Sequence, residues 1–445
     1  MQDPVNTQTS GVLAIAALRL VLMAAPRLSR LSGATCQKRE LDHAMLTKPT
    51  ILIVVAMVAT YALLSRRIES SLITLPMIFT GLGLALGGLG LGLVPMEVGN
   101  EVIHAIAEIT LILVLFSDAS GVKRETLSKN VAIPMRMLLI GMPLTILFGT
   151  LVARWVSPDL PWTLALLVAA ILTPTDAALG QSVVTSPNVP KRISQSINVE
   201  SGLNDGLAFP VVLVAAIFAA QATGVEGGRA PDNIALFALL QITLGPLAGA
   251  LVGYGAAKLL DLAVDRKAAT TVAQGLYFLS IAFLAYFGAE LIGGNGFIAA
   301  FVGGLVFGNT LRAPSMFIRE FMEGEGQLLT VVTFLVFGAV LAPIGLEHAN
   351  WKTVTLALLF LTVVRMVPIW LSLAGLKLNN YEKLFLSWFG PRGLASILFA
   401  LLVLEDFAVP GAEELAACVV LTVLLSIVLH GLTATPLSNR FKKLG

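Results

Sequence analysis

Two short stretches of this sequence place ionisable and hydroxyl side chains inside strongly apolar surroundings. The first reads Thr-Pro-Thr-Asp at 173–176, and the second reads Glu-Ser-Gly-Leu-Asn-Asp-Gly at 200–206. An ionisable residue at the centre of a lipid bilayer costs roughly 2.5–3.5 kcal/mol on insertion scales. Because this cost has to be offset, we interpret both stretches as candidates for function.

Pro174 predicts a break in the first stretch, since proline has no N–H to donate and disfavours helical geometry at Thr173. The carbonyl of Ala170, four residues back, is expected to be freed. Irregular backbone at membrane depth is tolerated only where it is buried in protein or lines a cavity. We therefore expect oxygen atoms of Thr173, Thr175 and Asp176 to face a polar cavity, which is the environment that hard cations prefer.

The second stretch predicts a polar arc on one helix. At about 100° per residue, Glu200 and Asn204 share one face, and Ser201 and Asp205 share the next. A structural hydrogen-bond network would account for Glu200 and Asn204. It accounts poorly for all four residues together, so Ser201 and Asp205 remain candidates for binding a ligand.

Charge balance singles out Asp205. Glu200 is expected to pair with Arg392, and Asp176 with Asn204 or with the positive end of a half-helix. Asp205 is then the carboxylate left for an exchangeable charge. Burial disfavours the ionised form of a carboxyl group, so a proton and a cation could compete for this side chain. Such competition is sufficient for exchange.

Two other buried charges are weaker candidates. Arg365, close to Pro368, is expected to partner a freed carbonyl or a carboxylate. Glu108, like Asp118 in the same helix, either lines an access path or lies near a helix end. Nothing in the sequence indicates a cofactor.

The composition indicates a polytopic membrane protein whose surroundings are the lipid bilayer. Of the 445 residues 56% are apolar and 13% are charged, against about 25% charged in soluble domains. The mean hydropathy is +0.87. Cys36 and Cys418 lie too far apart to suggest a disulfide or zinc site, and no basic run suggests nucleic acid.

Apolar stretches predict thirteen membrane-spanning helices in an all-α fold. A poorly ordered N-terminal extension over 1–48, a transmembrane domain over 49–440 and a cytoplasmic tail over 441–445 are expected. The predicted spans are 50–64, 72–94, 101–118, 131–153, 161–184, 194–220, 234–260, 272–291, 296–309, 327–344, 353–375, 381–404 and 414–435.

The span order predicts two inverted six-helix repeats, 50–220 and 272–435, joined by a linker helix at 234–260. Inverted repeats in transporters place the binding site where matching helices of the two halves are broken. The fifth span holds Pro174, and its counterpart, the twelfth, holds Phe-Gly-Pro-Arg-Gly at 389–393. We therefore expect two discontinuous helices that cross near the middle of the membrane.

Loop charges predict the orientation. Alternate loops are rich in Lys and Arg, whereas the loops between them are acidic, which places the basic loops and the C-terminus in the cytoplasm and the start of the first span outside. The basic loop residues are Arg66, Arg67, Lys123, Arg124, Lys129, Lys191, Arg192, Lys258, Arg266, Lys267, Arg312, Arg319, Lys377, Lys383, Arg440, Lys442 and Lys443.

Glycines at four-residue spacing predict close helix packing, within or between protomers. They are Gly83, Gly87, Gly88 and Gly92 in the second span and Gly245, Gly249 and Gly253 in the seventh.

At the two polar stretches and the Gly-Pro-Arg-Gly turn, the sequence resembles the NhaP type of Na⁺/H⁺ antiporter. This type belongs to the first monovalent cation:proton antiporter family, which includes the animal sodium/proton exchangers. The resemblance covers about 50–440. It implies a thirteen-helix inverted-repeat fold in a cell membrane, a homodimer, and a role in pH homeostasis.

The resemblance also implies roles for residues. Asp205 would bind the transported Na⁺ or proton, with Ser201, Thr175 and Asp176 contributing directly or through water. Asn204 would be held by Glu200 and Arg392. The Asn-Asp pair at 204–205 marks the electroneutral branch, because the electrogenic relatives have Asp-Asp there.

Three alternatives remain open at this point. K⁺/H⁺ exchange fits the same motifs, since they do not fix the size of the ion. A cation channel would not need a carboxylate for which protons compete. An intramembrane aspartyl protease using Asp176 and Asp205 would resemble a Gly-x-Gly-Asp pattern, whereas Leu203 and Asn204 precede Asp205 here.

Overall fold

The computed structural model describes residues 48–69, 73–93, 100–122, 131–221, 234–312, 316–406 and 411–442, and all regular structure within them is helical. The predicted extension, apart from Lys48, lies outside the described residues. So does the predicted tail, apart from Phe441 and Lys442.

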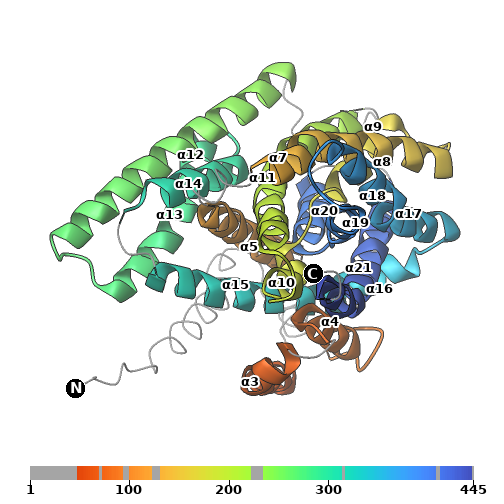
Figure 1. Ribbon diagram of the computed structural model, residues 1–445, viewed down its shortest axis with the longest axis horizontal. Coiled ribbons are helices and arrows are strands. Elements are labelled where there is room, and N and C mark those ends of the chain that lie inside the picture. Colours follow the sequence, from red (N-terminus) through yellow and green to blue (C-terminus); the bar gives the residue numbers. More distant parts are fainter. Residues whose placement is uncertain are drawn as a thin grey trace, which may run out of the picture. The chain divides into compact units, whose positions relative to one another are not determined.

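Each predicted span contains at least one helix of the structure (Figure 1). The helices are α3 (Lys48–Glu69), α4 (Leu75–Leu86), α5 (Asn100–Gly121), α7 (Ala132–Arg136), η1 (Met137–Gly141), α8 (Met142–Val156), α9 (Trp162–Ile171), α10 (Ala177–Val184), α11 (Lys191–Gln221), α12 (Ile234–Asp265), α13 (Thr271–Leu291), α14 (Gly296–Thr310), α15 (Met316–Val336), η2 (Phe337–Leu341), α16 (Ala342–Glu347), α17 (Trp351–Leu361), α18 (Val363–Ser372), α19 (Asn380–Trp388), α20 (Leu394–Asp406) and α21 (Ala412–Phe441).

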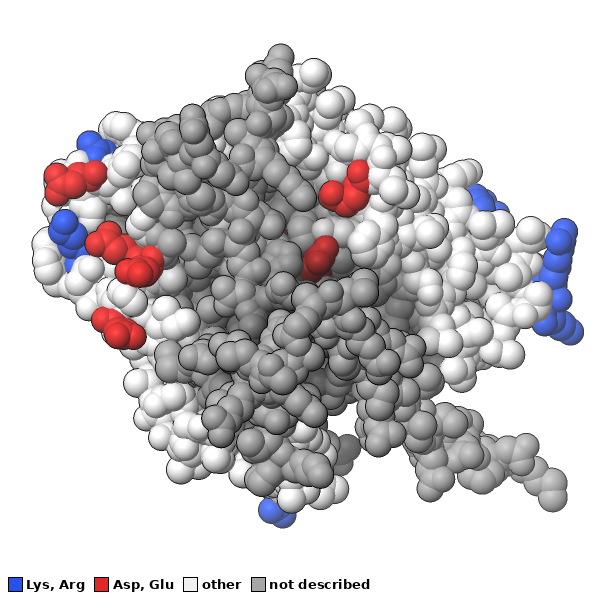
Figure 2. Space-filling model, turned by 180° about the vertical axis from the view of Figure 1, so that it is seen from behind, with Lys and Arg blue, Asp and Glu red and all other residues white. Residues whose placement is uncertain are grey.

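The helices have the length and surface expected of a polytopic membrane protein. Within the described residues, seven helical segments are long and apolar enough to cross a membrane, and several shorter helices are also apolar. Leucines such as Leu63 and Leu291 expose more than four fifths of their surface. Figure 2 shows that the described part of one face carries few charged side chains, with wide uncharged areas between them. Such a surface suits contact with lipid.

Both predicted helix breaks are present. The chain leaves helical geometry between α9 and α10 and again between α19 and α20. Three interruptions were not predicted. The π-helical turns η1 and η2 lie inside the fourth and tenth predicted spans, and Thr362 separates α17 from α18. Thr362 lies three residues before Arg365 and thus helps to set the direction of that side chain.

The buried core connects the broken helices to the rest of the protein. α11 packs against α9 and α10, and α21 packs against α10, α16, α17 and α20. α14 packs against both α12 and α5 (Figure 1). Phe116, Phe278 and Phe307 form an aromatic cluster among α5, α13 and α14, with ring centroids 4.9–5.9 Å apart.

The predicted glycine packing occurs within the chain, between α12 and α14. Gly245, Gly249 and Gly253 of α12 lie against the backbone of Asn295, Ala299 and Gly303, so both helices advance by four residues per contact. A Cβ atom at Gly249 would lie 2.8 Å from the Cα of Ala299. The two backbones therefore touch without intervening side chains, as small residues allow.

Replacing Gly249 should separate these helices. We expect Gly249→Ala to lower the melting temperature in detergent, because overpacking a tight contact costs about 1–3 kcal/mol. Gly255→Ala is the matched control, since a Cβ at Gly255 of the same helix meets no atom within 4 Å. Equal melting temperatures for the two variants would contradict the backbone contact.

Candidate functional site

The two helix breaks meet at Asp176. Its backbone N–H donates to the carbonyl of Pro391 at 2.8 Å, and its Oδ2 accepts from the backbone N–H of Leu394 at 2.6 Å. Asp176 is only 6% exposed. A residue from the first break therefore supplies both a donor and an acceptor to the second break.

The Asp176 carboxylate caps two half-helices at once. Oδ1 accepts from the N–H of Leu179 in the first turn of α10, at 3.3 Å, while Oδ2 accepts from the N–H of Leu394, the first residue of α20. Helix N-termini carry partial positive charge and unsatisfied N–H groups. The negative charge of Asp176 is thus held by half-helix ends, which was one of the two predicted arrangements.

The carbonyl groups in the last turn of α9 have donors from the following residues and from α20. The Thr173 hydroxyl donates to Ala169 O at 2.6 Å, and the Ser396 hydroxyl of α20 donates to Ile171 O at 2.8 Å. The predicted free carbonyl at Ala170 is instead engaged, because the N–H of Thr173 donates to it at 3.4 Å in a closing turn. The hydroxyl hydrogen of Thr173 is accordingly used within α9.

Part of the polar arc of α11 lies against the first break. The Ser201 hydroxyl is 3.1 Å from the Thr175 hydroxyl, and Asn204 Nδ2 donates to Thr175 Oγ1 at 2.5 Å. All three side chains are at most 2% exposed. Thr175 therefore joins the unwound segment to α11 through side chains alone.

Asp205 is buried one helical turn from Ser201 on α11. It is 8% exposed, and its Oδ1 has no hydrogen-bond partner among the described residues. Asp176 and Asp118, the latter on α5, lie close enough to interact electrostatically with it. Asp118 thus belongs to the surroundings of the site.

The predicted pairing of Glu200 with Arg392 is wrong. Arg365 of α18 donates from Nη1 and Nη2 to the two carboxylate oxygens of Glu200, at 2.5 and 2.9 Å. Both side chains are 3% exposed. A guanidinium matches a carboxylate in this two-point geometry, and the break at Thr362 lies just before Arg365. The predicted support of Asn204 by Glu200 and Arg392 is absent among the hydrogen bonds of the described residues.

Arg392 is engaged with its own turn. It is fully buried, its Nη1 donates to Gly390 O at 2.6 Å, and its backbone N–H donates to Ser426 Oγ at 2.7 Å. Its Nε and Nη2 have no hydrogen-bond partner within the described chain. The Arg365 guanidinium also lies against Gly390, where any Cβ would collide with it. Both arginines therefore converge on the second break.

The hydrogen-bond partner of Glu108 does not belong to the crossing of the two broken helices. The Tyr286 hydroxyl of α13 donates to its Oε1 at 2.6 Å. Glu108 therefore links α5 to α13, and the structure does not bring it into hydrogen-bond contact with the residues at the breaks.

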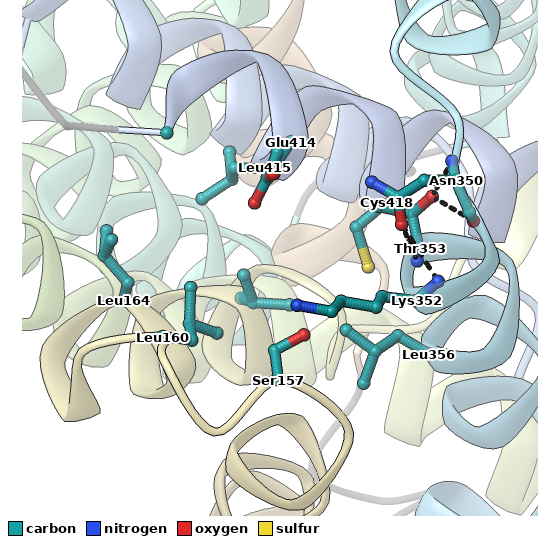
Figure 3. Close-up of a pocket in the computed structure, with 12 residues that line it drawn as sticks. Ser157, Leu160, Leu164, Asn350, Lys352, Thr353, Leu356, Glu414, Leu415 and Cys418 are labelled. Atoms are coloured by element: carbon teal, nitrogen blue, oxygen red, sulfur yellow. Dashed lines mark hydrogen bonds between the residues drawn. The ribbon is translucent and has the colours of Figure 1, made fainter.

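A small cavity of about 50 Å³ lies elsewhere, between the α8–α9 turn and the starts of α17 and α21. Figure 3 shows the Lys352 side chain extending across it, with Ser157 and Cys418 among the lining residues. None of the polar residues described above lines this cavity. The candidate site is therefore the crossing of the broken helices.

Comparisons with known proteins identify relatives of this chain. The Na(+)/H(+) antiporter NhaH of Halobacillus dabanensis is 30% identical over 295 residues, covering 64% of this chain and 70% of the relative. The K(+)/H(+) antiporter NhaP2 of Shewanella sp. strain ANA-3 is 26% identical over 388 residues, covering 85% of this chain. This chain spans 65% of the length of that second relative.

A solved structure supports the same fold. The sodium proton antiporter MjNhaP1 of Methanocaldococcus jannaschii at pH 8 superposes with a TM-score of 0.70 at 21% identity, covering 88% of this chain and 98% of that one. The family described as "Sodium/hydrogen exchanger, transmembrane" matches residues 53–440. The chain therefore belongs to the transmembrane sodium/hydrogen exchanger family, whose members are cation/proton antiporters and not enzymes.

Proposed function

We propose that this antiporter exchanges Na⁺ or Li⁺ for H⁺ in a one-to-one, electroneutral cycle, with Asp205 as the residue that binds both. The observation that carries the proposal is the uneven distribution of partners among three buried carboxylates. Asp176 caps two helices and Glu200 is paired with Arg365, whereas Asp205 Oδ1 has no partner in the described chain. A proton or a cation at Asp205 neutralises the same charge, so each excludes the other.

The proposed cation ligands are the oxygen atoms around Asp205. Asp176, Thr175 and Ser201 would contribute directly or through water, and Thr173 would contribute at the end of α9. The hydroxyl contact between Thr175 and Ser201 places two of these oxygen atoms together. Oxygen ligands suit alkali cations. Alternating access would carry this set between the two sides of the membrane as one unit.

Glu200, Arg365, Asn204 and Arg392 support the site in this proposal. The Glu200–Arg365 pair keeps one carboxylate permanently neutralised, and Asn204 contributes an amide in place of another charge. Exchange of one proton for one monovalent cation then leaves the net charge of the site unchanged. This charge balance supports electroneutral exchange.

K⁺/H⁺ exchange is the second candidate. It is favoured by relatives that carry that name, such as NhaP2 of Shewanella. Exchange assayed in vesicles with Na⁺, K⁺ and Li⁺ at several pH values distinguishes the two. Proton movement driven by K⁺ alone would replace the Na⁺ assignment.

We further infer the arrangement in the membrane. The helix positions and the alternation of loop charge support thirteen spans in two inverted repeats, a cytoplasmic C-terminus and a first span that starts outside. A homodimer is what the resemblance to NhaP antiporters implies. Labelling cysteines introduced at loop positions from each side of the membrane tests this orientation.

Asp205→Asn should abolish exchange, because an amide cannot take up a proton and leaves no negative charge for a cation. Fluorescence dequenching in vesicles energised with a pH gradient measures the loss. Asp159→Asn, at an exposed loop position, is the matched control and should exchange normally. Vigorous exchange by a folded Asp205→Asn protein would refute the mechanism.

Asn204→Asp should make exchange sensitive to membrane potential, or weaken folding, since it adds a second charge beside Asp205. Asn204 Oδ1 has no partner in the described region to neutralise that charge. Exchange rates with and without a K⁺/valinomycin potential measure the effect. Rates that match the wild type at every potential would show that Asn204 does not set the charge balance.

Glu200→Gln should destabilise the protein, because it leaves the buried Arg365 without its counter-charge, a loss of about 3–5 kcal/mol for such pairs. The double variant Glu200→Gln/Arg365→Gln should recover part of the loss. Melting temperatures of the single and double variants form a double-mutant cycle. Strictly additive effects would argue against the pairing.

A further inference from the structure

The unwound segment between α19 and α20 is held from two sides. On one side Asp176 bonds Pro391 and Leu394. On the other side α21 places Ser426 and His430 against the same segment, and these side chains are 0% and 1% exposed. Neither residue belongs to the cation site proposed above.

His430 joins both ends of the segment. Its Nε2 lies 3.0 Å from the carbonyl oxygen of Trp388, the last residue of α19, and its Nδ1 lies 3.2 Å from Ser426 Oγ. Ser426 Oγ in turn accepts the N–H of Arg392 at 2.7 Å. The imidazole also stacks on the Trp388 indole, with centroids 5.0 Å apart and planes 24° apart.

Both ring nitrogens of His430 have hydrogen-bond partners. Nε2 faces Trp388 O, which can only accept, so Nε2 must carry a hydrogen for this contact to be favourable. Nδ1 lies 3.1 Å from Ser426 O and 3.2 Å from Ser426 Oγ, and the same hydroxyl accepts the N–H of Arg392. His430 thus completes a chain of contacts from Trp388 through Ser426 to Arg392.

The same arrangement of helix and break occurs at the first crossing segment. There α11 sets Ser201 against Thr175, with Asp205 four residues later in α11. Here α21 sets Ser426 against Arg392, with His430 four residues later. The second break therefore has an imidazole where the first has a carboxylate, and this residue serves to fix the backbone.

We propose that His430 and Ser426 are positioning residues for cation binding. They hold residues 389–393 so that the N–H of Leu394 and the carbonyl of Pro391 meet Asp176, which in turn holds the cation-facing segment at Thr175. This inference rests on the proposed exchange at Asp205. It requires that loss of either side chain weakens cation binding through Asp176, without contact with the cation.

The test compares three variants of the full-length protein in vesicles. His430→Phe keeps the stacking on Trp388 but loses the hydrogen bonds, and Ser426→Ala removes the acceptor for Arg392. Each should raise the half-saturating Na⁺ concentration roughly three- to tenfold, the effect of one net hydrogen bond, with a smaller change in maximal rate. The double variant should be no worse than the more affected single variant, since both break one chain.

The matched control is Thr422→Val. Thr422 is fully buried one turn earlier on α21, and its hydroxyl donates to Cys418 O of its own helix. Its half-saturating concentration should equal that of the wild type. Unchanged values in folded Ser426→Ala and His430→Phe proteins, or an equal rise in Thr422→Val, would overturn the inference.

Amide hydrogen exchange separates this inference from the proposed function. The Arg392 amide should exchange faster in Ser426→Ala than in the wild type, whether or not the protein transports Na⁺. If the wild type exchanges neither Na⁺ nor Li⁺, the proposed function fails while this measurement still reports on the hydrogen-bond chain. An Arg392 amide that exchanges equally in both proteins would eliminate the chain itself.

Discussion

The structure depends on one constraint, namely that backbone polar groups inside a membrane need partners within the protein. Two helices are interrupted at the same place, and each interruption leaves N–H and carbonyl groups that lipid cannot satisfy. Asp176 provides partners for three of these groups, because its backbone N–H donates to Pro391 O and its carboxylate accepts from the N–H groups of Leu179 and Leu394. The two breaks are therefore stable only in each other's presence.

In the proposed mechanism, this mutual capping leaves Asp205 as the carboxylate that binds a proton or a cation. The Asp176 carboxylate accepts hydrogen bonds from helix ends, and the Glu200 carboxylate is paired with Arg365. Asp205 sits one helical turn from Ser201 on α11, close to the capped centre but outside its hydrogen bonds. A fixed set of hydrogen bonds thus surrounds one carboxylate with an unpaired oxygen, which is the combination that the proposed competition between a proton and a cation requires.

Much of this centre could be predicted from sequence, and the remainder could not for identifiable reasons. Proline at 174 and the Gly-Pro-Arg-Gly turn revealed both breaks, because these residue types act on their own backbone. The partner of Glu200 was predicted wrongly, since Arg365 and Arg392 both reach Gly390 and the choice depends on how α18 turns after Thr362. The position of His430 depends likewise on which face of α21 meets the second break. The effect of a residue on its own backbone can be predicted from sequence, whereas the rotation of a helix about its axis is set by packing.

The contact between α12 and α14 has a consequence for motion. Main chain rests on main chain at Gly245, Gly249 and Gly253, so there are no rotamers at these points that could yield to sliding. The two helices should move as one rigid unit during the transport cycle. Movement of the helices that hold the proposed cation site must then be accommodated at other helix contacts, where longer side chains can repack.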